Sequence, residues 1–117
     1  MKAPKVTTLN HYQAATAATA DFPDSGPYGG LEYLTLGVCG EAGEVAEKVK
    51  KQIRRGGDRD DPAFAAEVAK EIGDVLWYLS RLSARLGFSL ETIAQINLEK
   101  TYDRKARGVV KGTGDSR

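Results

Sequence analysis

Cysteine, histidine and long apolar runs are almost absent from this sequence. Its only cysteine is Cys39, so no internal disulfide can form, which fits a reducing compartment. No stretch approaches the roughly 18 consecutive apolar residues of a membrane-spanning helix. The first residues, Met1 to Lys5, lead into no apolar segment of the kind that a signal peptide needs. We therefore expect a cytoplasmic protein with no membrane partner.

An excess of charge of one sign is missing too. Lysine and arginine number 17, and aspartate and glutamate 16, which gives a formal net charge of +1. This balance argues against nucleic acid or an anionic membrane as the main partner. The length of 117 residues suggests one domain, with a core modest enough to be compatible with association of a second copy.

Strand-like alternation is also absent, and helical periodicity takes its place. We predict an all-α fold with four helices, in a single domain that spans residues 1–117. Residues 1–6 are expected to form a leader, and the glycine-rich residues 108–117 an irregular tail. The helices are expected from Thr7 or Thr8 to about Ala20, from about Leu31 to Arg55, from Asp61 or Pro62 to about Leu86, and from about Leu90 to Lys105.

The second and third helices each carry an apolar stripe with spacings of three and four residues. Such a stripe predicts the face of a helix that packs in the core. The stripe of the second helix is Leu31, Leu34, Val38, Ala42, Val45, Val49 and Ile53, and that of the third is Phe64, Val68, Ile72, Val75, Leu79, Leu82 and Leu86.

Two pairs of carboxylates lie beside these stripes. Glu41 and Glu44 are three residues apart, and so are Glu71 and Asp74. On a helix this spacing puts both side chains on one face, one turn apart. Four negative charges in one pocket are costly unless cations fill it. Oxygen ligands without histidine or cysteine partners indicate Mg²⁺ or Mn²⁺ rather than zinc.

A solvated acidic surface is the alternative interpretation of the first pair. Glu44 would then pair with Lys48, and Glu47 with Lys51, each i,i+4 pair contributing roughly 0.2–0.5 kcal/mol. The presence of two such pairs, each at the edge of an apolar stripe, favours the metal site.

A glycine inside each motif supports the same hypothesis. Gly43 separates the first two carboxylates, and Gly73 the second two. Glycine in a helix interior costs roughly 1 kcal/mol relative to alanine. We therefore expect the helices to approach closely at these glycines and to bring the carboxylates together.

A stripe on the fourth helix changes from amide to cationic: Asn97, Lys100 and Arg104. Cations near a helix C-terminus suit the helix dipole and need no ligand. Beside a metal site, however, the same stripe suits a polyphosphate. Metal, cations and phosphate together predict phosphoryl chemistry on a nucleotide.

Aromatic and amide side chains offer candidates for contacts to a nucleobase. Trp77 is the first choice, because its helical phase turns it away from the core stripe. Packing in the core or in an interface is the alternative role for each candidate. The other candidates are His11, Gln13, Phe22, Tyr28, Tyr33 and Tyr102.

These motifs resemble the ExxE…ExxD signature of the all-α nucleoside triphosphate pyrophosphohydrolases, and in particular their MazG-like branch. Glu41-x-x-Glu44 is followed, after residues 45–70, by Glu71-x-x-Asp74. The resemblance runs from about residue 9 to the C-terminus. The segments that carry it are residues 40–48, 71–78, 97–100, 104, 107–108 and 111–117.

The resemblance implies Mg²⁺-dependent hydrolysis of a (deoxy)nucleoside triphosphate to the monophosphate and pyrophosphate, as in cleaning of the nucleotide pool. By motif position, Glu41, Glu44, Glu71 and Asp74 would be the metal ligands and the catalytic residues. The metal would polarise the phosphate chain and lower the pKa of the attacking water.

The same resemblance implies where the substrate binds and how the chains assemble. Asn97, Lys100 and Arg104 would hold phosphates. Helices of two chains would assemble in a homodimer or a homotetramer. Independently of the resemblance, the glycine-rich tail has two interpretations: disorder, or folding of Lys111 and Arg117 over a phosphate or onto another subunit.

One position departs from the family pattern. Some relatives carry a glutamate directly before the first ligand, suggested as a general base, and here that residue is Gly40. A carboxylate among the ligands, Glu47, Glu67, or a water activated by the metal without a separate base would take its place. Two other functions stay open: hydrolysis of another nucleotide phosphoanhydride, and a non-enzymatic helical interaction module.

Overall fold

The computed structural model describes residues 1–112, 114 and 115, so the expectation for Arg117 lies outside the described residues. Four helices and no strand occur in this part of the chain, which confirms the all-α prediction with four helices. The helices are α1 (Leu9–Thr16), extended by the 3-10 turn η1 (Ala17–Thr19), α2 (Leu31–Arg54), α3 (Pro62–Arg85) and α4 (Leu90–Arg107).

Capping residues explain where the helices begin and end. Thr8, Asp61 and Ser89 each accept a hydrogen bond from a backbone N–H in the first turn of the helix that follows. Gly108 has a φ of 72°, in the left-handed region that favours glycine, and it ends α4 two residues after the predicted end. The predicted helix boundaries are therefore correct to within a few residues.

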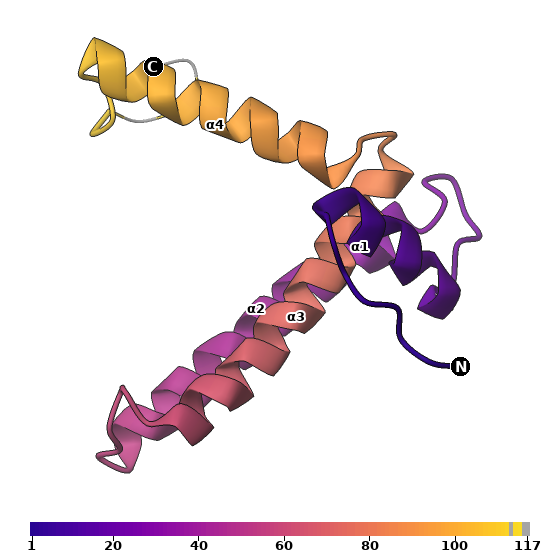
Figure 1. Ribbon diagram of the computed structural model, residues 1–117. Helices are drawn as coiled ribbons and strands as arrows, with labels where there is room; N and C mark the ends of the chain where they lie inside the picture. The colour runs from indigo at the N-terminus through magenta and orange to yellow at the C-terminus, as the bar shows by residue number, and fades with distance from the viewer. Residues whose placement is uncertain (113, 116–117) are drawn as a thin grey trace.

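Helices α2 and α3 lie side by side as a hairpin, and α4 leaves the end of α3 in a different direction (Figure 1). The hairpin packs closely at Gly37, where an added Cβ would overlap the ring of Tyr78. At Gly43 and Gly73 an added Cβ would meet no atom within 4 Å. The prediction that these two glycines mark the close approach is therefore wrong within the chain.

Helix α1 lies where α3 ends and α4 begins (Figure 1). The buried side chain of Gln13 donates through Nε2 to the carbonyl oxygens of Ser80, at 3.3 Å, and of Phe88, at 3.0 Å. Its Oε1 accepts from the backbone N–H of Leu90 at 2.9 Å. One side chain of α1 therefore satisfies backbone groups on both sides of the α3–α4 junction. Gln13 thus has a role in packing the helices together rather than in contacting a nucleobase.

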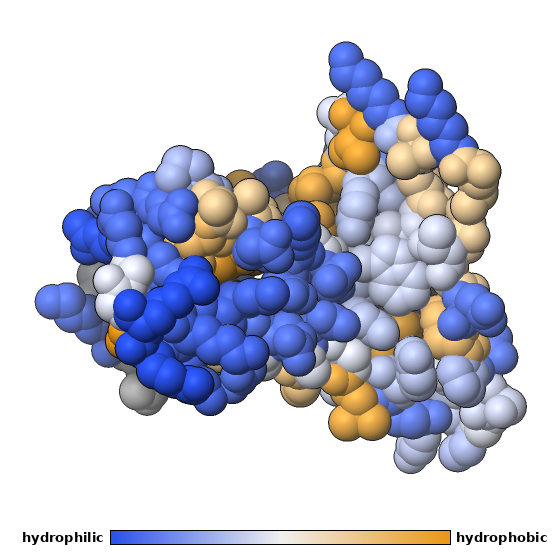
Figure 2. Space-filling model, turned by 90° about the horizontal axis from the view of Figure 1, so that it is seen from below, coloured by the Kyte–Doolittle hydropathy of each residue, from blue (hydrophilic) through white to orange (hydrophobic). Residues whose placement is uncertain are grey.

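Few apolar side chains are buried. Among the described residues, only Leu34 and Leu90 are buried hydrophobics. Much of the predicted core faces of α2 and α3 is open, with Ile53 at 73% and Ile72 at 54% exposure. The core prediction is thus wrong for these residues within a single chain, since the periodicity of a helix does not say what covers its apolar face. Figure 2 shows apolar side chains left open on the surface.

The molecule is extended for its size. Its radius of gyration is 17.1 Å, whereas a compact domain of this length would have about 13 Å. Its accessible surface is 8467 Å², against about 6,200 Å² for a compact monomer of this mass. None of the helices in the described part of the chain has the length and apolar character needed to cross a bilayer.

Candidate functional site

Three of the four predicted carboxylates meet between α2 and α3. Glu41, Glu71 and Asp74 each offer an oxygen, and these oxygens all lie within 4.8 Å of one another. Glu41 comes from α2, and the other two come from α3, one turn apart. The hairpin therefore builds the acidic cluster from both predicted motifs.

The negative charges of this cluster repel one another, although Lys48 Nζ lies 3.8 Å from a carboxylate oxygen of Glu71. The pKa of Glu41 is raised, first by burial and then by the negative charges of Asp74, Glu71 and Glu44. A positive ion between these oxygens would remove the repulsion. Three hard oxygen donors from a hairpin fit Mg²⁺ or Mn²⁺, which also keep water ligands. The residues present therefore suit the divalent metal that the sequence predicts.

Glu44 stands apart from the cluster. It is exposed and is not among the residues whose ligand oxygens gather, although its charge contributes to the raised pKa of Glu41. The pairing of Glu44 with Lys48 that a solvated acidic surface would give is not found, because Lys48 reaches across to α3 instead. Its Nζ lies 3.7 Å from Glu67 and 3.8 Å from Glu71.

Lys48 is a residue at the site whose contacts with α3 were not predicted from the sequence. It lies seven residues after Glu41, two helical turns along the same side of α2. This helical phase is the feature of the sequence that places Lys48 on the same side of α2 as the acidic cluster. The assignment of its partner failed because a lysine side chain can reach a neighbouring helix as easily as the preceding turn of its own.

The two non-ligand carboxylates considered as a general base are both tied to lysines. Glu47 pairs with Lys50 at 2.6 Å, rather than with Lys51 as predicted, and this hydrogen bond lowers the pKa of Glu47. Glu67 accepts a hydrogen bond from Lys70 at 3.0 Å, which lowers the pKa of Glu67. A lowered pKa makes a carboxylate a weaker proton acceptor, so neither is well suited to act as the base.

Two tyrosines that were not among the predicted site residues, Tyr12 and Tyr78, lie near the acidic cluster. Burial raises the pKa of Tyr78, helped by Tyr33 and by the charges of Glu41 and Asp74. Burial and the charge of Asp74 raise the pKa of Tyr12. These phenols therefore stay protonated and can donate hydrogen bonds beside the carboxylates.

Trp77 packs against Tyr78. Its ring meets that of Tyr78 edge-on, with centroids 5.0 Å apart, and its Nε1 donates to Thr19 Oγ1 at 2.9 Å. It lines a cavity of about 340 Å³ together with Tyr12 and with residues 1–4 and 6 of the N-terminal segment. Trp77 is one helical turn after Asp74, and Tyr12, whose pKa the charge of Asp74 raises, lines the same cavity, but none of the three clustered carboxylates lines it.

The cationic stripe is not brought to the acidic cluster within one chain. Lys100 lies about 15 Å along α4 from its start, and Asp74 about 17 Å before the end of α3, at 1.5 Å per residue. The two helices diverge from their junction (Figure 1). Asn97 is exposed, whereas Lys100 and Arg104 bind Asp115 of the tail.

Comparison with known proteins bears directly on these motifs. Residues 30–109 match the MazG nucleotide pyrophosphohydrolase domain. The "Gene 37 protein" of Mycobacterium phage L5 is 43% identical over 112 residues, which cover 91% of this chain and 96% of the phage protein. No solved structure matches the chain. The domain match includes both carboxylate motifs and the stripe on α4, and the chain therefore belongs to the MazG nucleotide pyrophosphohydrolase family.

Proposed function

We propose that the protein hydrolyses (deoxy)nucleoside triphosphates to the monophosphate and pyrophosphate with the help of Mg²⁺. The observation that carries the proposal is the gathering of Glu41, Glu71 and Asp74 within 4.8 Å in a chain of this family. Mn²⁺ would satisfy the same oxygen donors. A cytoplasmic location and a role in cleaning the nucleotide pool fit this activity.

The carboxylates have separate roles in this proposal. Glu41, Glu71 and Asp74 hold the metal, and Glu44, one turn from Glu41, is within reach to complete the ligand set. When bound, the metal supplies charge neutralisation on the phosphate chain and a water with a lowered pKa. Water adds across the phosphoanhydride bond between the α and β phosphates, and as that bond breaks the monophosphate and pyrophosphate are released, with the protons of the water passing to product oxygens or solvent.

Binding of the substrate needs the cations of α4. Lys100 and Arg104 offer charge-assisted hydrogen bonds to phosphate oxygens, and Asn97 offers an amide. Since α4 diverges from the hairpin of its own chain (Figure 1), we propose that a second copy supplies this helix. A homodimer or homotetramer would also cover the open apolar faces of α2 and α3.

Trp77 and its cavity suit the nucleobase. A volume of about 340 Å³ is within the range of small-molecule sites, and an indole ring offers a stacking surface. Asp74 is one helical turn before Trp77, so a base stacked on Trp77 would place its triphosphate toward the acidic cluster.

The test is a panel of ribo- and deoxyribonucleoside triphosphates, with a dinucleotide polyphosphate included, assayed with Mg²⁺ for monophosphate and pyrophosphate. Turnover should require the metal and should fall at least about 100-fold in Glu71→Gln, because loss of even an outer-shell partner typically costs 10–100-fold. Glu32→Gln, an exposed carboxylate at the start of α2, is the matched control and should keep full activity.

Two results would contradict the proposal. One is that no triphosphate in the panel is hydrolysed and Mg²⁺ does not raise the melting temperature. The other is that Glu71→Gln unfolds the protein, since that carboxylate would then be structural.

A further inference from the structure

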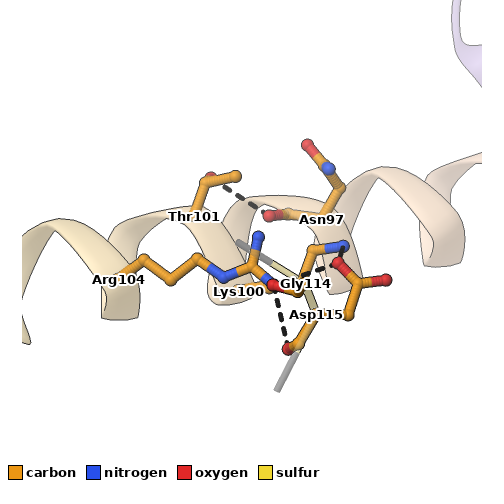
Figure 3. A network of polar contacts seen from close by, with 6 residues as sticks. All are labelled: Asn97, Lys100, Thr101, Arg104, Gly114 and Asp115. Atoms are coloured by element: carbon orange, nitrogen blue, oxygen red, sulfur yellow. Dashed lines mark hydrogen bonds and ion pairs between the residues drawn. The ribbon is translucent and has the colours of Figure 1, made fainter. Parts of the chain in front are cut away.

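The C-terminal tail turns back along α4 and places a carboxylate between two of its cations. After Gly108 ends the helix, the N–H of Val109 donates to the carbonyl oxygen of Arg104 at 3.0 Å. The chain then folds back, so that Asp115 Oδ1 accepts from Arg104 Nη2 at 3.0 Å and from Lys100 Nζ at 3.2 Å (Figure 3). One carboxylate oxygen thus bridges both cations.

Arg104 is unusually buried for a residue of a largely exposed helix. Only 6% of the residue is exposed, and its Nη2 also donates to the backbone oxygens of Asp115 at 2.9 Å and Gly114 at 3.4 Å. Its Nε is buried and has no hydrogen-bond partner among the described residues. A guanidinium has five donors, so this arrangement leaves buried donor capacity for a further acceptor.

The side chain of Asp115 is, in contrast, 83% exposed. Ion pairs that open to solvent are weak and exchange readily. The two backbone carbonyls already hold the tail to Arg104, so docking of the tail does not depend on the carboxylate. What the carboxylate adds is negative charge at the position where both cations converge.

We propose that Asp115 is an intramolecular competitor of phosphate: its carboxylate occupies the anion position between Lys100 and Arg104, and a phosphate group must displace it. This inference rests on the proposed function, which assigns these two cations to the substrate. A phosphate oxygen fits the same position, because it accepts from both cations and offers further oxygens to the unused donor of Arg104. The tail is then a self-inhibitory contact that substrate or pyrophosphate relieves.

This competitor stays charged under working conditions. Hydrogen bonds from Arg104 and then from Lys100 lower the pKa of Asp115. The contact is therefore released by a competing anion rather than by a change of pH near neutrality.

The test is titration of the full chain with inorganic pyrophosphate in the presence of Mg²⁺, with the binding affinity measured by calorimetry. Asp115→Asn keeps the shape and the backbone carbonyls but removes the competing charge. Its affinity for pyrophosphate should rise about two- to tenfold, as expected when the two ion pairs of an exposed carboxylate no longer oppose binding. The KM for a nucleoside triphosphate should fall by a similar factor with kcat unchanged.

Asp103→Asn is the matched control. It removes the same charge from α4, but from an exposed aspartate that pairs with Arg107, and its pyrophosphate affinity should stay within about twofold of the wild type. Equal or weaker binding by Asp115→Asn, no binding by either protein, or an equal gain in Asp103→Asn overturns the inference. If pyrophosphate binding responds as expected but no triphosphate is hydrolysed, the competition stands and the proposed activity fails.

Discussion

Gly37 and Tyr78 fix the distance between the two helices that carry the carboxylates. The ring of Tyr78 fills the space in which a side chain of α2 would otherwise lie. The hydroxyl of the same ring is close enough to Glu41 and Asp74 for their charges to raise its pKa. Because Gly37 has no Cβ, the Tyr78 ring can pack against α2, and this packing places the Tyr78 hydroxyl beside the acidic cluster.

Gly37→Ala should destabilise the protein by about 1–3 kcal/mol, the usual cost of overpacking, because the new Cβ overlaps the Tyr78 ring. Gly40→Ala is the control one turn along the same helix, where an added Cβ meets no atom within 4 Å. It should stabilise the helix by about 0.5–1 kcal/mol. Chemical denaturation of both variants measures the difference, and an equal effect would show that Gly37 is not a packing requirement.

How far the sequence predicts the site is visible at individual residues. Glu41, Glu71 and Asp74 come together as predicted from spacing and phase alone. Spacing also pointed to Gly43 and Gly73 as contact points, and this was wrong, because a helical pattern locates a face but not the neighbour that meets it. Tyr12 could not be found at all, because its approach to Asp74 depends on how α1 packs on α3.

Helix α1 is short, but it contacts both α3 and α4. Its side chains serve the beginning of α4, where Asn10 Oδ1 accepts from the N–H of Glu91 at 3.1 Å and Gln13 Oε1 from that of Leu90. The first N–H groups of a helix have no partner within it, so these contacts orient α4 as well as cap it. The direction of α4 is thus set by α1, a relation that periodicity cannot reveal.

Gln13→Ala should therefore destabilise the protein by about 2–4 kcal/mol, because it leaves several buried backbone groups without partners at about 1–3 kcal/mol each, partly relieved by water. Gln95→Ala is the control, since Gln95 is an exposed glutamine of α4 that only pairs with Glu99. Its effect should stay within about 0.5 kcal/mol. Denaturation gives the stabilities, and amide exchange at residues 90–93 should accelerate in Gln13→Ala alone. Equal stabilities for the two variants would show that Gln13 does not hold the junction.

At the scale of the whole molecule, a single chain has two features that nothing within the described residues accounts for. Its accessible surface exceeds that of a compact monomer by more than about 2,000 Å², more than one partner's share of a standard protein–protein interface. Its acidic cluster and its cationic stripe lie on elements that diverge (Figure 1). The helices, their boundaries and the acidic motif follow from the sequence. What covers the open apolar faces does not, because apolar periodicity is the same whether a face meets its own chain or another.

Both features would be explained if α4 of one copy reached the hairpin of another. Complementation between inactive variants tests this arrangement. Glu71→Gln lacks a metal ligand, and Lys100→Ala lacks a phosphate contact, so each should be inactive alone. If sites are shared, a mixed dimer has one site with both defects and one with neither. Random exchange makes half of the dimers mixed, so activity should return to about one quarter of the wild type. A site built from one chain would carry its own defect in every dimer, so a mixture without activity, despite subunit exchange verified with tagged chains, would contradict the shared site.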